Sequence, residues 1–105
     1  MKALKIIVYV PVSHADRLRK AIGQSGGGKI GDYSFCSFSM KGIGKFLPMK
    51  GARPAVGRVG KIQKVHEERI EFVCAAQHIQ QVIAAIRKAH PYEEPAIETW
   101  PIHLP

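Results

Sequence analysis

The sequence predicts an α+β fold, a ferredoxin-like split βαβ sandwich whose antiparallel sheet carries two helices on one face. Three observations support this prediction. Four segments have the alternation or apolar character of strands, two have helical periodicity, and their order is β-α-β-loop-β-α-β. A chain of 105 residues is long enough to bury a real core. We therefore expect residues 1–105 to form a single domain.

The first strand and helix are predicted from the amino-terminal quarter. Residues 3–12, ALKIIVYVPV, are β-branched and apolar on both faces, which is typical of an inner strand covered on both sides. Ser13 is expected to cap the following helix. The segment SGGG at 25–28 is expected to end that helix, because glycine accepts the left-handed conformation of a helix end. Its buried stripe is predicted to be Ala15, Leu18, Ala21 and Ile22.

The middle of the chain predicts a second strand followed by a long excursion. Residues 29–40, KIGDYSFCSFSM, alternate in the manner of an irregular strand. Residues 41–60 are punctuated by glycine and proline, so we expect a hairpin around residues 46–49 and a mobile loop.

The carboxy-terminal half predicts a strand, a helix and a last strand. In residues 64–74, Ile70, Phe72 and Cys74 share one face. Residues 75–90 have apolar side chains at helical spacing, and Pro91 should stop that helix because proline lacks an N–H. Residues 95–103 are expected to complete the sheet.

The sheet face without helices is predicted to be too apolar for open water. Ile7, Tyr9 and Val73 lie on it. Apolar faces of this kind are normally covered by another part of the molecule or by a partner. We therefore expect either the long loop or a further subunit to lie against it.

Positive charge is concentrated in one segment of a chain whose formal net charge is +8. Residues 41–64 carry no acidic side chain, and a local positive field attracts anions. We predict an anion-binding loop there, although a loop charged only for solubility fits as well. Nucleic acid is disfavoured, because Phe46 is the one aromatic side chain among these cations. The candidate anion-binding residues are Lys41, Lys45, Lys50, Arg53, Arg58, Lys61 and Lys64.

Composition predicts a cytoplasmic protein without a membrane span. No run of about 18 apolar residues occurs. Pro11 interrupts the amino-terminal apolar run, so we interpret it as a strand and not as a signal peptide. Cys36 and Cys74 are too few for a disulfide scaffold and suggest a reduced compartment, with a Cys36–Cys74 bridge left open.

Several motifs resemble known proteins. The tail AHPYEEPAIETWPI is similar to the end of the CutA-like, PII-like trimeric proteins. Almost the whole chain resembles the domain inserted in YqfO-like (Nif-three-like) dinuclear-metal proteins; Asp32 and Ile43 depart from residues common there. The motifs that carry this resemblance are, in order, PVSHADRLRKAI, GGGKIGDYSFCSFSMKGIGKFLP, GARPAVGRVGKIQKVHEERIEFV and AAIRKAHPYEEPAIE.

The resemblance implies a PII/CutA-like variant of the ferredoxin-like fold and a homotrimer. We expect a stand-alone version of the insert, because the halves that carry the two-metal site in the larger proteins have no counterpart in these residues. The resemblance implies no known activity.

The HPYEEP motif at residues 90–95 supplies some of the candidate site residues. Glu93 and Glu94 could serve acid–base or metal chemistry, but Pro91 and Pro95 favour an architectural turn. A metal site would need ligands gathered from separate elements, with His90, Glu93 and Cys36 as weak candidates. The predicted ligand cleft consists of Tyr33, Cys36, Glu68, Arg69, Tyr92 and Glu93, with the cations of 41–64 as a mobile lid.

The leading functional hypothesis is a non-enzymatic, trimeric module of the PII/CutA-like type that binds a small ligand or has a regulatory role. No cofactor is required, although a divalent metal is left open. The expected partners are copies of the chain, and then a small anionic ligand or a partner protein. The alternative is a metal-assisted hydrolase-like enzyme or a divalent-metal-binding protein.

Overall fold

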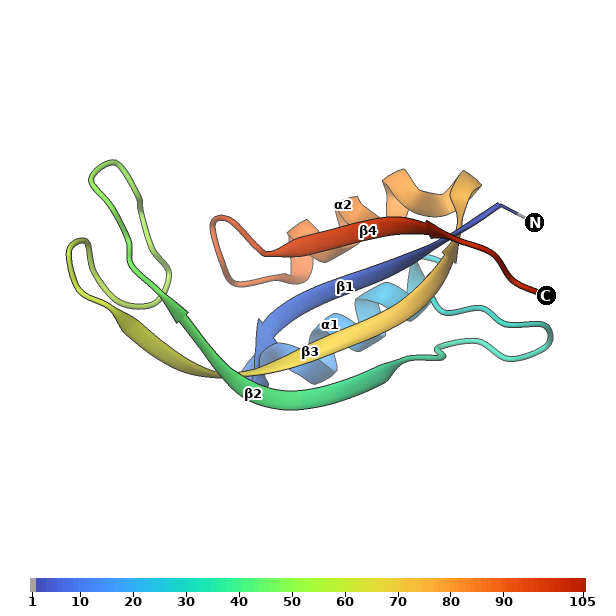
Figure 1. Cartoon of the computed structure of the whole chain (residues 1–105), viewed down its shortest axis with the longest axis horizontal. Coiled ribbons are helices and arrows are strands. Elements are labelled where there is room, and N and C mark those ends of the chain that lie inside the picture. Colours follow the sequence, from blue (N-terminus) through green and yellow to red (C-terminus); the bar gives the residue numbers. More distant parts are fainter. Residues whose placement is uncertain (1) are drawn as a thin grey trace.

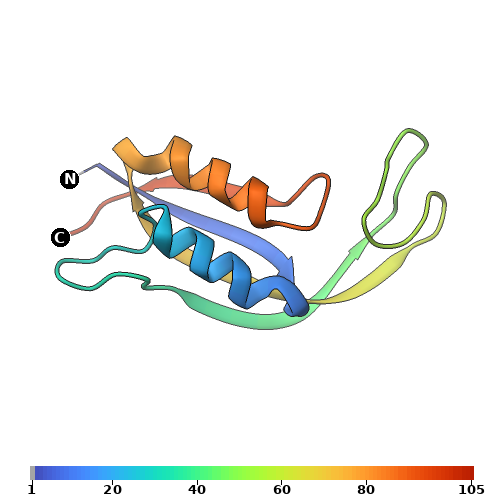
Figure 2. The ribbon, with the colours of Figure 1, turned by 180° about the vertical axis from the view of Figure 1, so that it is seen from behind.

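A computed structural model describes residues 2–105. Four antiparallel strands form one sheet in the order β2-β3-β1-β4, and both helices cover the same face (Figures 1 and 2). The predicted α+β, ferredoxin-like class is confirmed. The elements are β1 (Ala3–Pro11), α1 (Val12–Gln24), β2 (Phe38–Phe46), β3 (Gln63–Ala75), a 3-10 turn (Ala76–His78), α2 (Ile79–Ala89) and β4 (Ile97–Ile102).

The core lies between the sheet and the helices, as the sequence patterns indicate. Alternate residues of β1 and β3 point into it, because successive side chains of a strand face opposite sides. The helices contribute one apolar stripe each. The buried cluster is formed by Ile6, Val8, Val10, Ala15, Leu18, Ile22, Ile70, Phe72, Cys74, Val82 and Ile86.

The start of α1 differs from the prediction. The helix begins at Val12 and the residue in the capping position is Pro11, which makes no side-chain capping bond. Ser13 is therefore not the cap: it lies within the first turn, and its hydroxyl contacts His14 Nδ1 at 2.9 Å. Proline leads directly from strand to helix here because its φ of −54° suits a helix entry.

The second strand lies later in the chain than predicted. Residues 29–37 form a loop with one isolated bridge between Ile30 and Tyr33, and β2 starts only at Phe38. The strand continues through the glycines at 42 and 44, because it pairs with β3 from Phe38↔Glu71 to Phe46↔Gln63. The predicted hairpin at 46–49 and the loop over 41–60 are thus wrong in their bounds, since long-range pairing outweighs the glycine signal.

The connection between β2 and β3, residues 47–62, is called the arm. It extends beyond the helix-covered body and lies at one end of the molecule, whose long axis is 46 Å (Figures 1 and 2). The chain turns back through bonds from the Ala52 amide to the Met49 carbonyl, 3.0 Å, and from the Gly60 amide to the Pro48 carbonyl, 2.9 Å.

The remaining strands agree with the predictions to within two residues at each end. The second helix was predicted over residues 75–90, but α2 begins four residues later, after the 3-10 turn. Helix α2 ends at Ala89, and His90 has an extended backbone, as expected of a residue before proline. Edge strand β4 contains Pro101, which is tolerated there because one side of an edge strand needs no N–H donor. Among residues 2–105, no helix is long and apolar enough to cross a membrane.

Candidate functional site

The segment from His90 to Ala96, called the turn, is held by histidine hydrogen bonds. The Tyr92 amide donates to His90 Nδ1 at 3.0 Å, so the ring proton resides on Nε2. That nitrogen in turn donates to the Tyr9 carbonyl of β1 at 2.6 Å. Burial lowers the pKa of His90. A neutral imidazole thus ties the end of α2 to the central strand.

Tyr92 connects the turn to β3 and β2. Its hydroxyl donates to Glu67 Oε2 at 2.8 Å, and its ring meets the Phe46 ring edge-on, with centroids 5.7 Å apart. Burial, followed by the bond to Glu67, raises the pKa of Tyr92 well above its ordinary range. Gly44 makes room for this arrangement, because a Cβ there would lie 1.9 Å from Glu67 Oε1.

A cavity of about 330 Å³ lies where the arm, the sheet and the turn meet. The arm is tied to the turn by the Arg53 amide, which donates to Glu93 Oε1 at 2.9 Å. Pockets of this size accept small organic molecules. The walls are Tyr9, Gly44, Lys45, Phe46, Leu47, Pro48, Ala52, Pro54, Ala55, Val56, Glu67, Tyr92, Glu93, Glu94 and Ala96.

A second hollow of about 290 Å³ adjoins the first on the open sheet face, the face without helices. Gly42 and Gly44 of β2 line it together with Arg69, whose guanidinium lies 6.0 Å from the Tyr9 ring centroid. Tyr9, Gly44 and Glu67 line both hollows.

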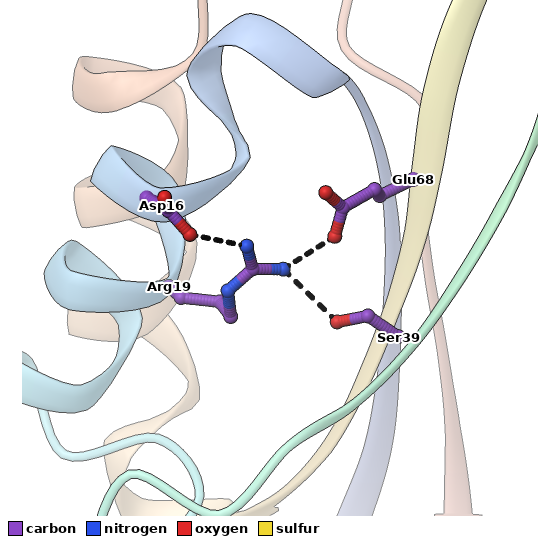
Figure 3. A network of polar contacts seen from close by, with 4 residues as sticks. All are labelled: Asp16, Arg19, Ser39 and Glu68. Carbon is purple, nitrogen blue, oxygen red and sulfur yellow. Dashed lines mark hydrogen bonds and ion pairs between the residues drawn. The ribbon is translucent and has the colours of Figure 1, made fainter.

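Glu68 belongs to a separate network on the helix face. Arg19 of α1 donates to Glu68 Oε1 at 2.5 Å, to the Ser39 hydroxyl at 3.0 Å and to Asp16 (Figure 3). Glu68 is only 7% exposed. These bonds raise the pKa of Arg19, with Glu68 the largest cause. The network joins α1 to β2 and β3.

The predicted cleft does not form as one site. Tyr92 and Glu93 line the cavity, Arg69 lines the adjoining hollow, and Glu68 faces the helices. Tyr33 and Cys36 lie in the 29–37 loop, which is fixed near Val73 through Gly28. Since Val73 and Glu67 are six residues apart on β3, roughly 20 Å separates the two ends. Alternation and strand length place these residues apart.

The weak metal candidates also lie apart. Both ring nitrogens of His90 already bond to the backbone, and Cys36 lies at the other end of β3 from Glu93. Within residues 2–105, no group of three or more His, Cys, Asp or Glu side chains could hold a metal ion. Both cysteines are free thiols, and burial raises the pKa of Cys74.

All seven candidate anion-binding cations are exposed. In the described part of the chain, none of them forms an ion pair with an acidic side chain. Lys45 lines the cavity. Anion binding by this segment stays a prediction.

Sequence reasoning missed most of the cavity walls, among them Tyr9, Phe46 and Glu67. Alternation in β3 was the available signal for Glu67, because it places the Glu67 and Glu68 side chains on opposite faces of the sheet. The contribution of Phe46 depends on the length of β2, which the glycines obscured.

The sequence of the chain is similar to a family model and to several curated proteins. The family model described as CutA1 divalent ion tolerance protein matches residues 58–104. The chain is 46% identical over 101 residues to the GTP cyclohydrolase 1 type 2 homolog of Mycobacterium tuberculosis, which covers 96% of the chain and 27% of that protein. The Bacillus subtilis homolog is 46% identical over 98 residues, which cover 93% of this chain and 26% of that protein. The chain thus spans about a quarter of the length of these curated relatives.

Solved structures agree. The Bacillus cereus protein related to NIF3 superposes with a TM-score of 0.83 and 42% identity, over 96% of this chain and 26% of that one. The periplasmic divalent cation tolerance protein CutA of Archaeoglobus fulgidus superposes with a TM-score of 0.69 and 18% identity, over 100% of this chain and 87% of that one. B. subtilis GlnK superposes with a TM-score of 0.61 and 14% identity, over 97% of this chain and 86% of that one. The last two show the fold alone. The resemblance inferred from the motifs is confirmed: the chain has a CutA/PII-like variant of the ferredoxin-like fold, and its sequence is similar to about a quarter of the NIF3-related proteins.

Proposed function

We propose that this chain, whose sequence matches a CutA/PII-like quarter of the GTP cyclohydrolase 1 type 2 homologs, is a non-enzymatic, homotrimeric module that binds a small ligand. The observation that carries the proposal is the cavity at the base of the arm. Three segments distant in sequence form its walls, and a ligand there would contact the sheet, the turn and the arm together. Binding requires no metal or cofactor.

The open sheet face supports the homotrimer. Phe38 is 62% exposed, Met40 45% and Trp100 42%. These three residues share the face with Ile7 and Val73, because directly paired residues of an antiparallel sheet point to the same side. The arm lies at one end of the molecule (Figure 1), so other copies of the chain are the proposed cover for the rest of this face.

Binding is favoured over catalysis by the state of the titratable groups around the turn. His90 and Tyr92 could transfer protons, but both are held in hydrogen bonds that position the backbone and Glu67. The chain matches only about a quarter of the relatives named as GTP cyclohydrolase 1 type 2 homologs. We therefore propose no cyclohydrolase activity for this chain.

A cavity-filling variant tests the proposal. Val56→Trp should fill the cavity, whereas Val59→Trp places the same side chain elsewhere on the exposed arm. A fragment library is screened by ligand-observed NMR against wild type and both variants. We expect fragments that bind wild type and the Val59→Trp variant but not the Val56→Trp variant. If every fragment that binds tolerates Val56→Trp, the cavity is not the ligand site.

A further inference from the structure

The walls of the cavity combine rings with unpaired acid oxygens. Tyr9, Phe46 and Tyr92 provide aromatic surface, and the arm adds aliphatic side chains and prolines. Such walls favour a flat apolar group, because aromatic rings pack edge-on or offset against one another.

The charge of the cavity is opposite to that of the chain. The formal net charge is +8, yet the cavity walls contain three carboxylates and one cation, Lys45. Glu67 accepts the Tyr92 hydroxyl through Oε2, and Glu93 accepts the Arg53 amide through Oε1. Across residues 2–105, no hydrogen bond reaches the other oxygen of either residue, and none reaches Glu94. Glu67 is half-buried, and Glu93 and Glu94 are exposed at the cavity rim. An ionised carboxylate only accepts hydrogen bonds, so these free oxygens can accept bonds from a cationic donor that displaces water.

We propose that the cavity binds an organic cation, a ring bearing a protonated amine, and discriminates against the corresponding carboxylate. The ring would lie among Tyr9, Phe46 and Tyr92, and the ammonium would donate to the oxygens of Glu67, Glu93 and Glu94. The same rings stabilise a cation over their faces. A volume of about 330 Å³ holds one small ring system with a short chain.

This inference rests on the proposed function and replaces the anionic ligand expected from composition, at this site only. The exposed cations of the arm, Lys50, Arg53, Arg58 and Lys61, are predicted to attract anions, whereas the cavity at its base has mostly acidic charged walls. The two sites therefore select opposite charges.

Three indole probes of similar size separate the possibilities: tryptamine, 3-methylindole and indole-3-propionate. Calorimetry and NMR at pH 7 should give the tightest binding for tryptamine and the weakest for indole-3-propionate. Glu94→Gln should weaken tryptamine binding about threefold to tenfold and leave 3-methylindole unchanged, since about 1 kcal/mol corresponds to a fivefold change. Asp32→Asn removes one negative charge from the 29–37 loop and should change neither.

Each result has a defined meaning. If 3-methylindole or the propionate binds as tightly as tryptamine, and Val56→Trp abolishes that binding, the cationic preference is wrong and the proposed function stands. Tryptamine binding that survives Val56→Trp lies elsewhere and overturns the inference. Absence of binding for all three probes at 1 mM also overturns it, while the fragment screen tests ligand binding independently.

Discussion

Glu67 and Glu68 are neighbours in sequence with different roles, because adjacent strand residues face opposite sides of the sheet. Glu67 accepts the Tyr92 hydroxyl at the cavity, on the open side. Glu68 accepts from Arg19 in the helix layer. One carboxylate thus positions the turn, and the other holds α1 against the sheet.

Removing Arg19 should destabilise the fold strongly. Arg19→Met leaves the buried Glu68 carboxylate unpaired, which costs on the order of 3 kcal/mol. Arg17→Met, on the exposed side of α1, should change stability by less than about 0.5 kcal/mol. The double variant Arg19→Met/Glu68→Met should recover much of the loss. Urea unfolding of the four proteins measures these differences, and equal effects of the two single variants would contradict a structural role for the network.

His90 should make stability depend on pH. Its pKa is lowered on folding from an ordinary value of 6.5, so the unfolded chain binds the proton more readily. Neutral His90 makes its full contribution to the free energy of unfolding above about pH 6.5. This contribution is lost as the pH falls through the lower pKa of the folded state. Unfolding free energies at pH 7.5, 6.5 and 5.5 should fall more steeply in wild type than in His90→Gln. Parallel curves would show that His90 is not held neutral.

At the scale of elements, local signals predicted most of the fold. The β1 and β3 alternation and the α2 stripe identify those elements, and Pro91 ends α2 as expected. The error over β2 has a physical cause. Gly42 and Gly44 are strand residues because they pair with Glu67 and Val65 of β3, a contact between distant segments that local propensity does not contain.

The arm should bind anions in a salt-dependent way. Its cations are exposed, and exposed charges are screened beyond about 10 Å at 0.1 M salt. Replacing Lys50, Arg53 and Arg58 with alanine should weaken nucleotide or phosphate binding without lowering the melting temperature. Calorimetry at 20 mM and 200 mM salt provides the measurement. If no nucleotide binds at low salt, the charge of the arm serves solubility alone.

At the scale of the whole molecule, the candidate site was only half predictable. Tyr92 and Glu93 stand out by their proline-bounded motif, and they do line the cavity. The remaining walls come from β1, the end of β2 and the arm, which meet only in the folded chain. Tyr33 and Cys36 are distinctive residue types, but the length of β3 separates them from the turn.

The central claim also concerns the whole molecule: copies of the chain cover the open face and form a ligand-binding trimer. Met40→Glu would place a charge on that face, whereas Ile43→Glu places it on the opposite side of β2. We expect only the former to weaken assembly in light scattering, because burying an unpaired charge is costly. Equal behaviour of the two variants would locate the contact elsewhere.

Native mass spectrometry of freshly purified protein at micromolar concentration tests this claim most directly, because it reports subunit number and retained ligand together. The account predicts a species of three times the 11.6 kDa chain mass, carrying a small additional mass that is lost on denaturation. A single 11.6 kDa chain with no additional mass would contradict it.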